Sequence, residues 1–193
     1  NTKYVRVGDI ARALRTAVEN WAASGAKLEA VYQKLNGNEI PEAQTVDENL
    51  FHSPLPRSFQ WADGSAFLHH VKLVRMARNA AMPESLYQTP LMYQGGSDSF
   101  LAPREDIPQV DFSHGTDFEG EVAVIVDHVP MGATPQEALD KILLFVIVND
   151  VSLRGLIPEE LAAGFGFLQS KPSSAFAPFA VTADEFGEAW REG

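Results

Sequence analysis

The acidic segment Asp117–Asp127 constrains the fold of this chain more than any other stretch. β-Branched and apolar residues fill it from Val122 to Val126, which predicts a β-strand. Successive strand side chains alternate between faces, so Glu119 and Glu121 point the same way. Two neighbouring carboxylates raise each other's pKa unless a positive charge lies between them. A divalent cation is therefore expected to hold them together, and the alternative is an edge strand with two solvated acids.

Composition limits the classes of protein to consider. The chain has 193 residues, of which 45% are hydrophobic and 21% charged, and this suits one globular domain with a small N-terminal appendage. Its 15 basic and 26 acidic residues give a net charge of -11, which argues against nucleic acid and anionic membranes as partners. The absence of cysteine excludes disulfides, thiolate nucleophiles and cysteine-ligated zinc. No stretch approaches the roughly 20 apolar residues of a membrane span, and we expect a cytoplasmic protein.

Two regions follow one another along the chain. The pattern of residues 1–56 predicts a small helical or mixed N-terminal region followed by a linker. Residues 57–193 form the second region. Asp9 is expected to cap a first helix that reaches Trp21 along one apolar face. A second helical pattern is expected to end at Asn36, where a glycine follows.

The second region mixes helical and strand patterns. Apolar spacing predicts a helix from Phe67 to Ala77, and a capping box at Thr134 predicts the start of another. The continuous apolar run Ile142–Val148 is typical of a buried strand. Residues Pro158–Ala163 indicate a short helix, and Phe176–Thr182 indicates a further strand.

Two acidic residues stand where a carboxylate needs a partner. Asp150 follows the buried run, and desolvating it is costly unless it is paired; its alternative role is to cap the following turn. If the segment that contains Asp63 and His70 is helical, both residues lie near one face, two turns apart. The alternative is that Asp63 caps this helix and His70 lies on the surface.

Four carboxylates from three elements are therefore candidates for one cation site. They are Asp63, Glu119, Glu121 and Asp150. Oxygen-only ligation suits a hard cation, so Mg²⁺ or Ca²⁺ is expected and Mn²⁺ is a further candidate, ahead of zinc. Lys171 follows a glycine-aromatic loop and would serve this cluster as an electrostatic clamp, unless it is a solvated surface lysine.

These residues resemble the fumarylacetoacetate hydrolase family over roughly residues 59 to 190. The order and spacing of three segments carry the resemblance: Asp117–Glu121, Val148–Arg154, and Gln169–Lys171 leading to Ala177-Pro178. Two further segments, Trp61–Ser65 and Pro90–Gly96, resemble the shorter bacterial fumarylacetoacetases in particular.

The resemblance implies a fold and a set of roles. The fold is a mixed β-roll, or β-sandwich-like α+β catalytic fold, of which residues 57–193 would be the N-terminal portion. The four carboxylates would ligate the divalent metal, and His70 would be the base that activates water. Ser65, Tyr93, Arg154 and Lys171 would bind the substrate, and Arg154 and Lys171 would also take part in catalysis. The family also implies a homodimer.

The reaction implied by the resemblance is hydrolysis of a carbon–carbon bond in a β-diketone acid. For the nearest members it yields fumarate and acetoacetate from fumarylacetoacetate, in tyrosine breakdown. The metal would polarise a carbonyl, the imidazole would take a proton from water, and the lysine and arginine would stabilise the oxyanion. A decarboxylase, hydratase, isomerase or acylpyruvate hydrolase acting on another 2-oxo acid is an alternative on the same fold. A catalytically silent calcium-binding or scaffold protein is another.

The chain departs from the family pattern in two places. A threonine usually follows the lysine by a few residues, and here Ser173 and Ser174 occupy that region. Family members also continue past Gly193 into further strands that complete the site. We therefore expect that the natural protein is longer and that this segment alone is unstable or inactive.

Overall fold

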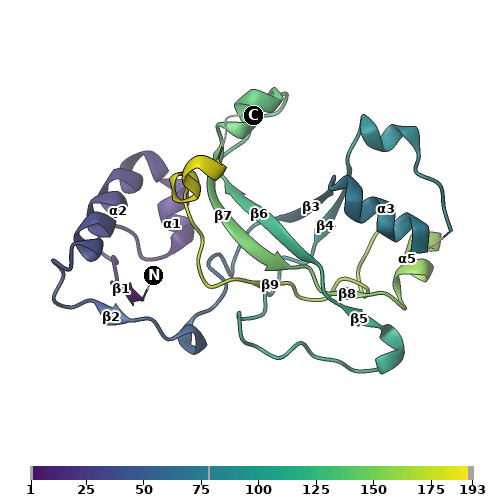
Figure 1. Ribbon diagram of the computed structural model, residues 1–193, viewed down its shortest axis with the longest axis horizontal. Coiled ribbons are helices and arrows are strands. Elements are labelled where there is room, and N and C mark those ends of the chain that lie inside the picture. The colour runs from purple at the N-terminus through teal and green to yellow at the C-terminus, as the bar shows by residue number, and fades with distance from the viewer. Residues whose placement is uncertain (1, 78, 191–193) are drawn as a thin grey trace.

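The computed structural model describes residues 2–77 and 79–190, which combine short helices with small antiparallel sheets. This element order confirms the predicted α+β class. In Figure 1 the N-terminal helices α1 (Leu14–Glu19) and α2 (Trp21–Asn36) lie on one side of a long central strand pair, and the helix α3 (Leu68–Ala77) lies on the other side.

The N-terminal part holds two helices and one small sheet. Its elements are β1 (Lys3–Tyr4), α1 (Leu14–Glu19), α2 (Trp21–Asn36), β2 (Gln44–Thr45) and the 3₁₀ turn η1 (Glu48–Leu50). Strand β2 pairs antiparallel with β1, so the segment after α2 returns to the start of the chain. The predicted end of the second helix at Asn36 is confirmed.

The predicted start of the first helix is wrong. Asp9 lies in an isolated turn in which the amides of Ile10 and Ala11 both donate to the carbonyl of Val7. Helix α1 begins only at Leu14, after Ala13, and it stops before the expected Trp21. Asn20 has a non-helical backbone between α1 and α2, which separates one apolar pattern into two helices.

A three-stranded sheet forms the centre of the molecule. Its strands are β6 (Gly120–Val126), β7 (Ile142–Asn149) and β9 (Ala175–Phe176), in the order β6-β7-β9. The strands predicted from the acidic segment and from the apolar run are confirmed. One sheet face carries the core, and its buried members are Phe100, Val146, Val148 and Phe176.

The strand predicted over Phe176–Thr182 is shorter than expected. Strand β9 ends at Phe176, and only an isolated bridge between Val181 and Phe145 continues the pairing. Pro178 interrupts the ladder because proline has no backbone N–H to donate.

The third helix lies between the two strands of an antiparallel pair. Strands β3 (Trp61–Ser65) and β4 (Leu91–Gly95) pair antiparallel, and α3 (Leu68–Ala77) follows β3. The predicted helix from Phe67 is confirmed to within one residue. Asp63 therefore lies in a strand, and the prediction that Asp63 and His70 share one helical face is wrong. The Asp-Gly pair in this segment opposes helix formation and leaves the apolar helical pattern to begin after it.

The remaining elements are short. They are β5 (Thr116–Asp117), β8 (Ser152–Leu153), α4 (Pro135–Leu139), α5 (Ile157–Ala163) and the 3₁₀ turns η2 (Glu84–Tyr87), η3 (Phe112–His114) and η4 (Ala183–Ala189). The capping box predicted at Thr134 is confirmed: the Thr134 hydroxyl accepts from the Glu137 amide, and the Glu137 carboxylate accepts from the Thr134 amide. The short helix predicted over Pro158–Ala163 is also confirmed.

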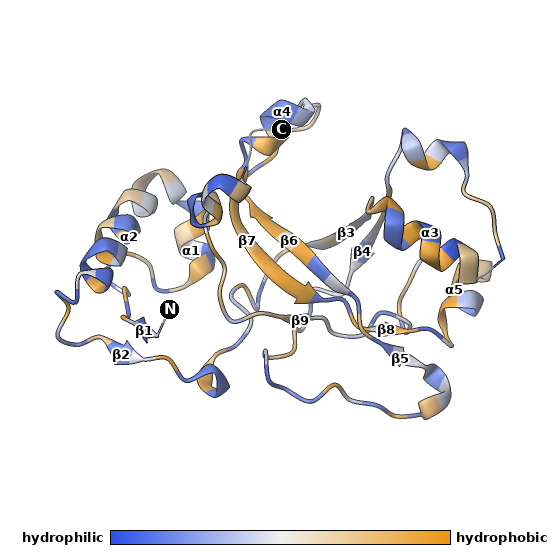
Figure 2. Ribbon diagram, viewed as in Figure 1, coloured by the Kyte–Doolittle hydropathy of each residue, from blue (hydrophilic) through white to orange (hydrophobic). Residues whose placement is uncertain are grey.

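The second face of the central sheet is apolar but partly open. Figure 2 shows β6 and β7 as the longest continuous hydrophobic strands. Phe145 on this face packs edge-on against Phe186 and Trp190, with ring centroids 5.0 Å away in each case. The cross-strand pair Val122 and Ile147 remains 72% and 64% exposed. The packing on this face is therefore concentrated at the end near η4.

The contact between Trp61 and Gly95 gives a test of the hairpin. A Cβ at Gly95 would lie 1.9 Å from Trp61 Cδ1, and the indole also packs against Phe176. We expect Gly95→Ala to displace the indole and lower the free energy of unfolding by about 1–3 kcal/mol. Urea titration measures this change. Gly64→Ala is the control, because its Cβ would meet nothing within 4 Å, and equal midpoints for the two variants would contradict the prediction.

Candidate active site

Three carboxylates converge from three parts of the chain. Asp63 comes from β3, Glu121 from β6, and Asp150 directly follows β7. One oxygen of each lies within 4.8 Å of the others. Asp63 and Asp150 are buried and Glu121 is half-buried, so the prediction of solvated acids on an edge strand does not describe them.

The strand register explains this convergence. Glu121 pairs with Val148 across β6 and β7, so its side chain projects from the same sheet face as the core. The amide of Asp150 donates to the carbonyl of Glu119 over 2.9 Å, which fixes the chain where β7 ends. Asp63 shares a strand face with Trp61, which packs against the same core. The apolar core therefore positions all three acids.

Crowding and burial change the ionisation of these acids. Burial, together with the charges of Asp63, Asp150 and Glu119, raises the pKa of Glu121 to about 7. Burial and the charge of Asp150 also raise the pKa of Asp63. A positive charge placed among the three oxygens would relieve both effects.

The carboxylate triad Asp63, Glu121 and Asp150 fits a hard divalent cation. Its donors are all carboxylate oxygens, which Mg²⁺, Ca²⁺ and Mn²⁺ prefer. Opposite ligands lie roughly 5 Å apart around Ca²⁺, so oxygens within 4.8 Å of one another suit this ion, whereas Mg²⁺ requires them to lie within roughly 4 Å.

Glu119, the fourth predicted ligand, is held by cations of the chain itself. Its Oε2 lies 2.6 Å from Lys171 Nζ, and its Oε1 lies 2.5 Å from an Arg154 guanidinium nitrogen. Burial alone would raise its pKa, but the Lys171 and Arg154 charges outweigh burial and lower it. The structure does not bring Glu119 into the triad, and its role as a metal ligand stays a prediction.

Lys171 is the buried cation of the site and is not a solvated surface lysine. Its ammonium donates to Glu119 Oε2 and Asp150 Oδ2, each at 2.6 Å, and to Ser152 Oγ at 2.7 Å. The ammonium also lies 5.5 Å from the centre of the Tyr93 ring. One lysine thus links the triad to Glu119, in the geometry expected of an electrostatic clamp.

Hydroxyl groups complete the surroundings of Asp150. The Tyr93 hydroxyl donates to Asp150 Oδ2, and Ser174 Oγ donates to Oδ1 over 3.1 Å. Burial, followed by this bond to Asp150, raises the Tyr93 pKa well above its ordinary value, so the phenol stays a donor. Ser174 thus supplies a hydroxyl in the region where the family usually has threonine.

His70 approaches the site from the solvent side. Its Nε2 lies 3.5 Å from Glu119 Oε1, and its side chain is 40% exposed. The imidazole can therefore meet water on one side and a buried carboxylate on the other. Its predicted partner Asp63 belongs to a different element, and Glu119 is the acid it faces.

Arg154 bridges two acids at the edge of the site. Its Nε donates to Asp117 Oδ2 over 2.8 Å, while the other end of the guanidinium contacts Glu119. This bond, ahead of the opposing effect of burial, lowers the pKa of Asp117. Ser65, the remaining predicted substrate residue, is half-buried at the end of β3, on the same strand face as Asp63.

Sequence reasoning assigned no role to three residues that contact the site. Asp117 accepts a hydrogen bond from Arg154 and so orients it. Ser152 accepts a hydrogen bond from Lys171, and Ser174 donates one to Asp150. Ser152 lies two residues after Asp150, and strand alternation is a signal that could have placed it on the same side. Asp117 and Ser174 depend on pairing between distant segments, which no local spacing reveals.

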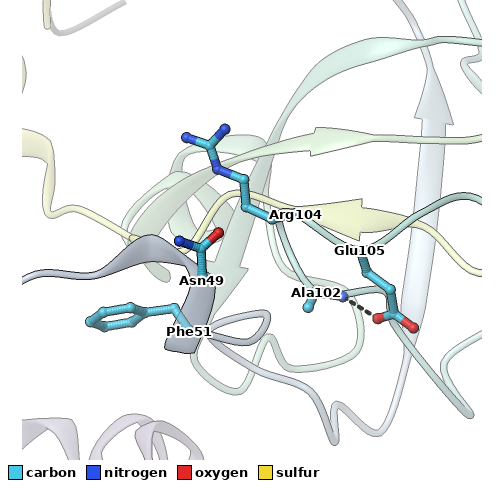
Figure 3. Close-up of a pocket in the computed structure, with 5 residues that line it drawn as sticks. All are labelled: Asn49, Phe51, Ala102, Arg104 and Glu105. Carbon is cyan, nitrogen blue, oxygen red and sulfur yellow. Dashed lines mark hydrogen bonds between the residues drawn. The ribbon is translucent and has the colours of Figure 1, made fainter.

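A separate cavity lies away from the carboxylates. It has a volume of about 290 Å³ and is lined by Asn49, Phe51, Ala102, Arg104 and Glu105, as Figure 3 shows. Its only marked contact in that view runs from the Ala102 amide to the Glu105 carboxylate, at 2.8 Å. None of the predicted site residues lines it.

Two family models match this chain. The family model described as the C-terminal part of fumarylacetoacetate hydrolase matches residues 60–192. A second model, described as fumarylacetoacetase N-terminal domain 2, matches residues 1–57. The chain belongs to the fumarylacetoacetate hydrolase family. The predicted boundary between residues 56 and 57 stays a prediction.

Similar solved structures share low sequence identity with this chain. The crystal structure of Cg1458 with inhibitor is 18% identical, with a TM-score of 0.49 over 73% of this chain and 48% of its own. The structure of an uncharacterized protein from Mycobacterium abscessus is 18% identical, with a TM-score of 0.48 over 74% of this chain and 51% of its own. The chain therefore spans about half the length of these structures. No curated protein matches it.

Membrane insertion has no support among the helices. Within residues 2–77 and 79–190, no helix combines the length and apolar character that crossing a bilayer requires.

The raised pKa of Glu121 predicts how stability depends on pH. Between its ordinary value of 4.5 and about 7, the folded chain keeps a proton on Glu121 that the unfolded chain has released. The free energy of unfolding therefore falls as pH rises through this interval, and a divalent cation at pH 7 should restore it.

Urea titrations at several pH values, in EDTA and again with a divalent cation, measure this contribution for the wild-type chain and Glu121→Gln. The variant should lose this part of the pH dependence and the stabilisation by metal. An unchanged pH slope in the variant would show that the effect arises elsewhere.

Proposed function

We propose that this site hydrolyses a carbon–carbon bond in a β-diketone acid, with fumarylacetoacetate as the substrate and fumarate and acetoacetate as the products. The proposal rests on one arrangement: a buried carboxylate triad, a buried lysine that bridges it to Glu119, and a partly exposed histidine on the other side of Glu119. The segments Trp61–Ser65 and Pro90–Gly96, which resemble short bacterial fumarylacetoacetases, support this choice of substrate.

Each part of the arrangement has a chemical role in this proposal. His70 is reached by water and takes a proton from it, and Glu119 favours the imidazolium that results. Lys171 and Arg154 carry the positive charge that attracts the substrate's carboxylate and oxo groups. Tyr93 remains protonated, and its single O–H, which donates to Asp150 in this structure, would turn to a substrate oxygen when substrate binds.

A divalent cation belongs to this proposal. Asp63, Glu121 and Asp150 would hold Mg²⁺ or Ca²⁺, with Mn²⁺ as a further candidate and Glu119 as the fourth predicted ligand. When bound, such an ion supplies Lewis-acid polarisation of a carbonyl. The homodimer implied by the resemblance and the cytoplasmic location expected from the sequence remain part of the proposal.

Replacing His70 tests the hydrolytic role. We expect His70→Ala to lower kcat by about 10²–10⁴-fold, the usual contribution of a general base, without changing the affinity for metal. His69→Ala is the matched control, because His69 is the exposed neighbour on the same helix. Steady-state kinetics and calorimetric metal titration provide the two readouts. Equal kcat values for the two variants would show that His70 is not the base. A scaffold protein, which has no catalytic base, would give that result.

Metal removal and a substrate panel test the reaction itself. In the full natural chain, fumarylacetoacetate absorbance should fall with Mg²⁺ or Ca²⁺ present, fumarate should appear, and EDTA should stop both changes. Metal binding without loss of fumarylacetoacetate would contradict this substrate. Acylpyruvates and other 2-oxo acids in the same assay would then distinguish an acylpyruvate hydrolase, decarboxylase, hydratase or isomerase.

A further inference from the structure

We propose that Glu160 is a positioning residue of this site: its carboxylate anchors the segment Leu168–Ser170 and thereby places the Lys171 ammonium between Glu119 and Asp150. The kinetic part of this inference rests on the proposed function. The structural part, the placement of Lys171, does not depend on which substrate is used.

Three successive backbone amides converge on one carboxylate. The Gln169 amide donates to Glu160 Oε1 over 2.7 Å, and the amides of Leu168 and Ser170 donate to Oε2 over 3.1 and 3.2 Å. The Ser170 hydroxyl donates to Oε2 as well. Successive amides turned to one side form a concave anion site, and here a carboxylate from the preceding helix fills it.

The anchored segment leads directly to the lysine. Ser170 is fully buried, and its carbonyl also accepts a hydrogen bond of 2.8 Å from the Leu153 amide in β8. The residue before Lys171 is therefore held through its amide, its hydroxyl and its carbonyl. A shift of this residue would move the start of the Lys171 side chain, whose ammonium makes contacts of 2.6 Å to two acids.

Little else holds this loop. Helix α5 ends at Gly164, which has a left-handed backbone, and Gly166 has a φ of 98°. Phe165 between them is 97% exposed and Leu168 is also exposed, so apolar burial contributes little at these positions. The Phe167 ring does pack against Tyr93, with centroids 4.9 Å apart. The hydrogen bonds to Glu160 are thus the main polar restraint between α5 and Lys171.

The ionisation of Glu160 agrees with an anchoring role. Burial is the largest single effect and raises its pKa, but the Ser170 hydroxyl and the three amides together outweigh burial and lower the pKa overall. The charged form is therefore the one that the loop stabilises. Among the described residues, no hydrogen bond or ion pair joins Glu160 to the carboxylate triad, so any effect on the site must pass through the loop.

The test compares Glu160→Gln with Glu159→Gln in the full natural chain with metal bound. The first substitution removes one acceptor oxygen and the charge, and it places an amide donor among the loop amides. The second alters an exposed acid in the same helical turn. Hydrogen exchange by mass spectrometry reports on residues 164–171, and acetylation of Lys171 by an N-hydroxysuccinimide acetate reports on the lysine, with Lys141 as the internal reference.

Glu160→Gln should speed amide exchange at Leu168–Ser170, speed acetylation of Lys171, and lower kcat at least tenfold, with metal affinity unchanged. Glu159→Gln should match the wild-type chain in all of these measurements. Faster exchange with unchanged Lys171 acetylation and unchanged kcat would reduce Glu160 to a loop tether and overturn the proposal. If the wild-type chain turns over none of the oxo acids, the proposed function fails, and exchange and acetylation still decide the placement of Lys171.

A second variant guards against misfolding of the first. Ser170→Ala removes only the hydroxyl donor and keeps the three amides, so it should change exchange and acetylation in the same direction by a smaller amount. No change in either readout for this variant, together with a misfolded Glu160→Gln, would also count against the proposal.

Discussion

The structure depends on how it accommodates negative charge next to an apolar core. Two unit charges 4.8 Å apart repel by roughly 3–4 kcal/mol at an effective dielectric constant of about 20. Three such pairs would cost on the order of 10 kcal/mol, comparable with the whole stability of a domain. Among the described contacts, Lys171 pairs with Asp150 alone of the triad, so it cannot offset this repulsion by itself. Protonation of Glu121 and the binding of a cation are the two ways to relieve the remainder.

Lys171 connects the two halves of the site because its ammonium contacts a carboxylate of each. It bridges Asp150, a member of the triad, and Glu119, which belongs with Arg154 and His70. A buried charge tolerates little displacement, since each of its partners would be left unpaired. The position of the backbone that carries Lys171 is therefore a strong structural requirement, and the bonds between α5 and the following loop meet it without using any residue of the carboxylate triad.

Sequence patterns predicted the parts of this structure that repeat locally. The alternation after Gly120 and the apolar run that ends at Val148 gave the central strand pair, and the capping box at Thr134 gave the start of α4. Local patterns failed where a single residue changed the outcome, as Pro178 did in the predicted last strand and Asn20 did between α1 and α2. Strand alternation and the cost of burying charge singled out the four carboxylates and Lys171 as candidates, whereas Ser65, Tyr93 and Arg154 were assigned by the resemblance alone. Contacts such as those of Asp117 and Glu160 join separate segments and have no periodic signature.

Glu119 separates a solvent-facing side of the site from a dry side. The His70 side chain is 40% exposed, whereas the Lys171 side chain is 7% exposed, and both contact the same carboxylate. In the proposed reaction, proton transfer from water belongs on the exposed side, where protons can exchange with solvent. Stabilisation of developing negative charge belongs on the dry side, because a fixed cation acts more strongly where water is excluded. Because Glu119 contacts both His70 and Lys171, it can hold the two at a fixed distance from each other. A change in the position of either residue should therefore alter the position of the other.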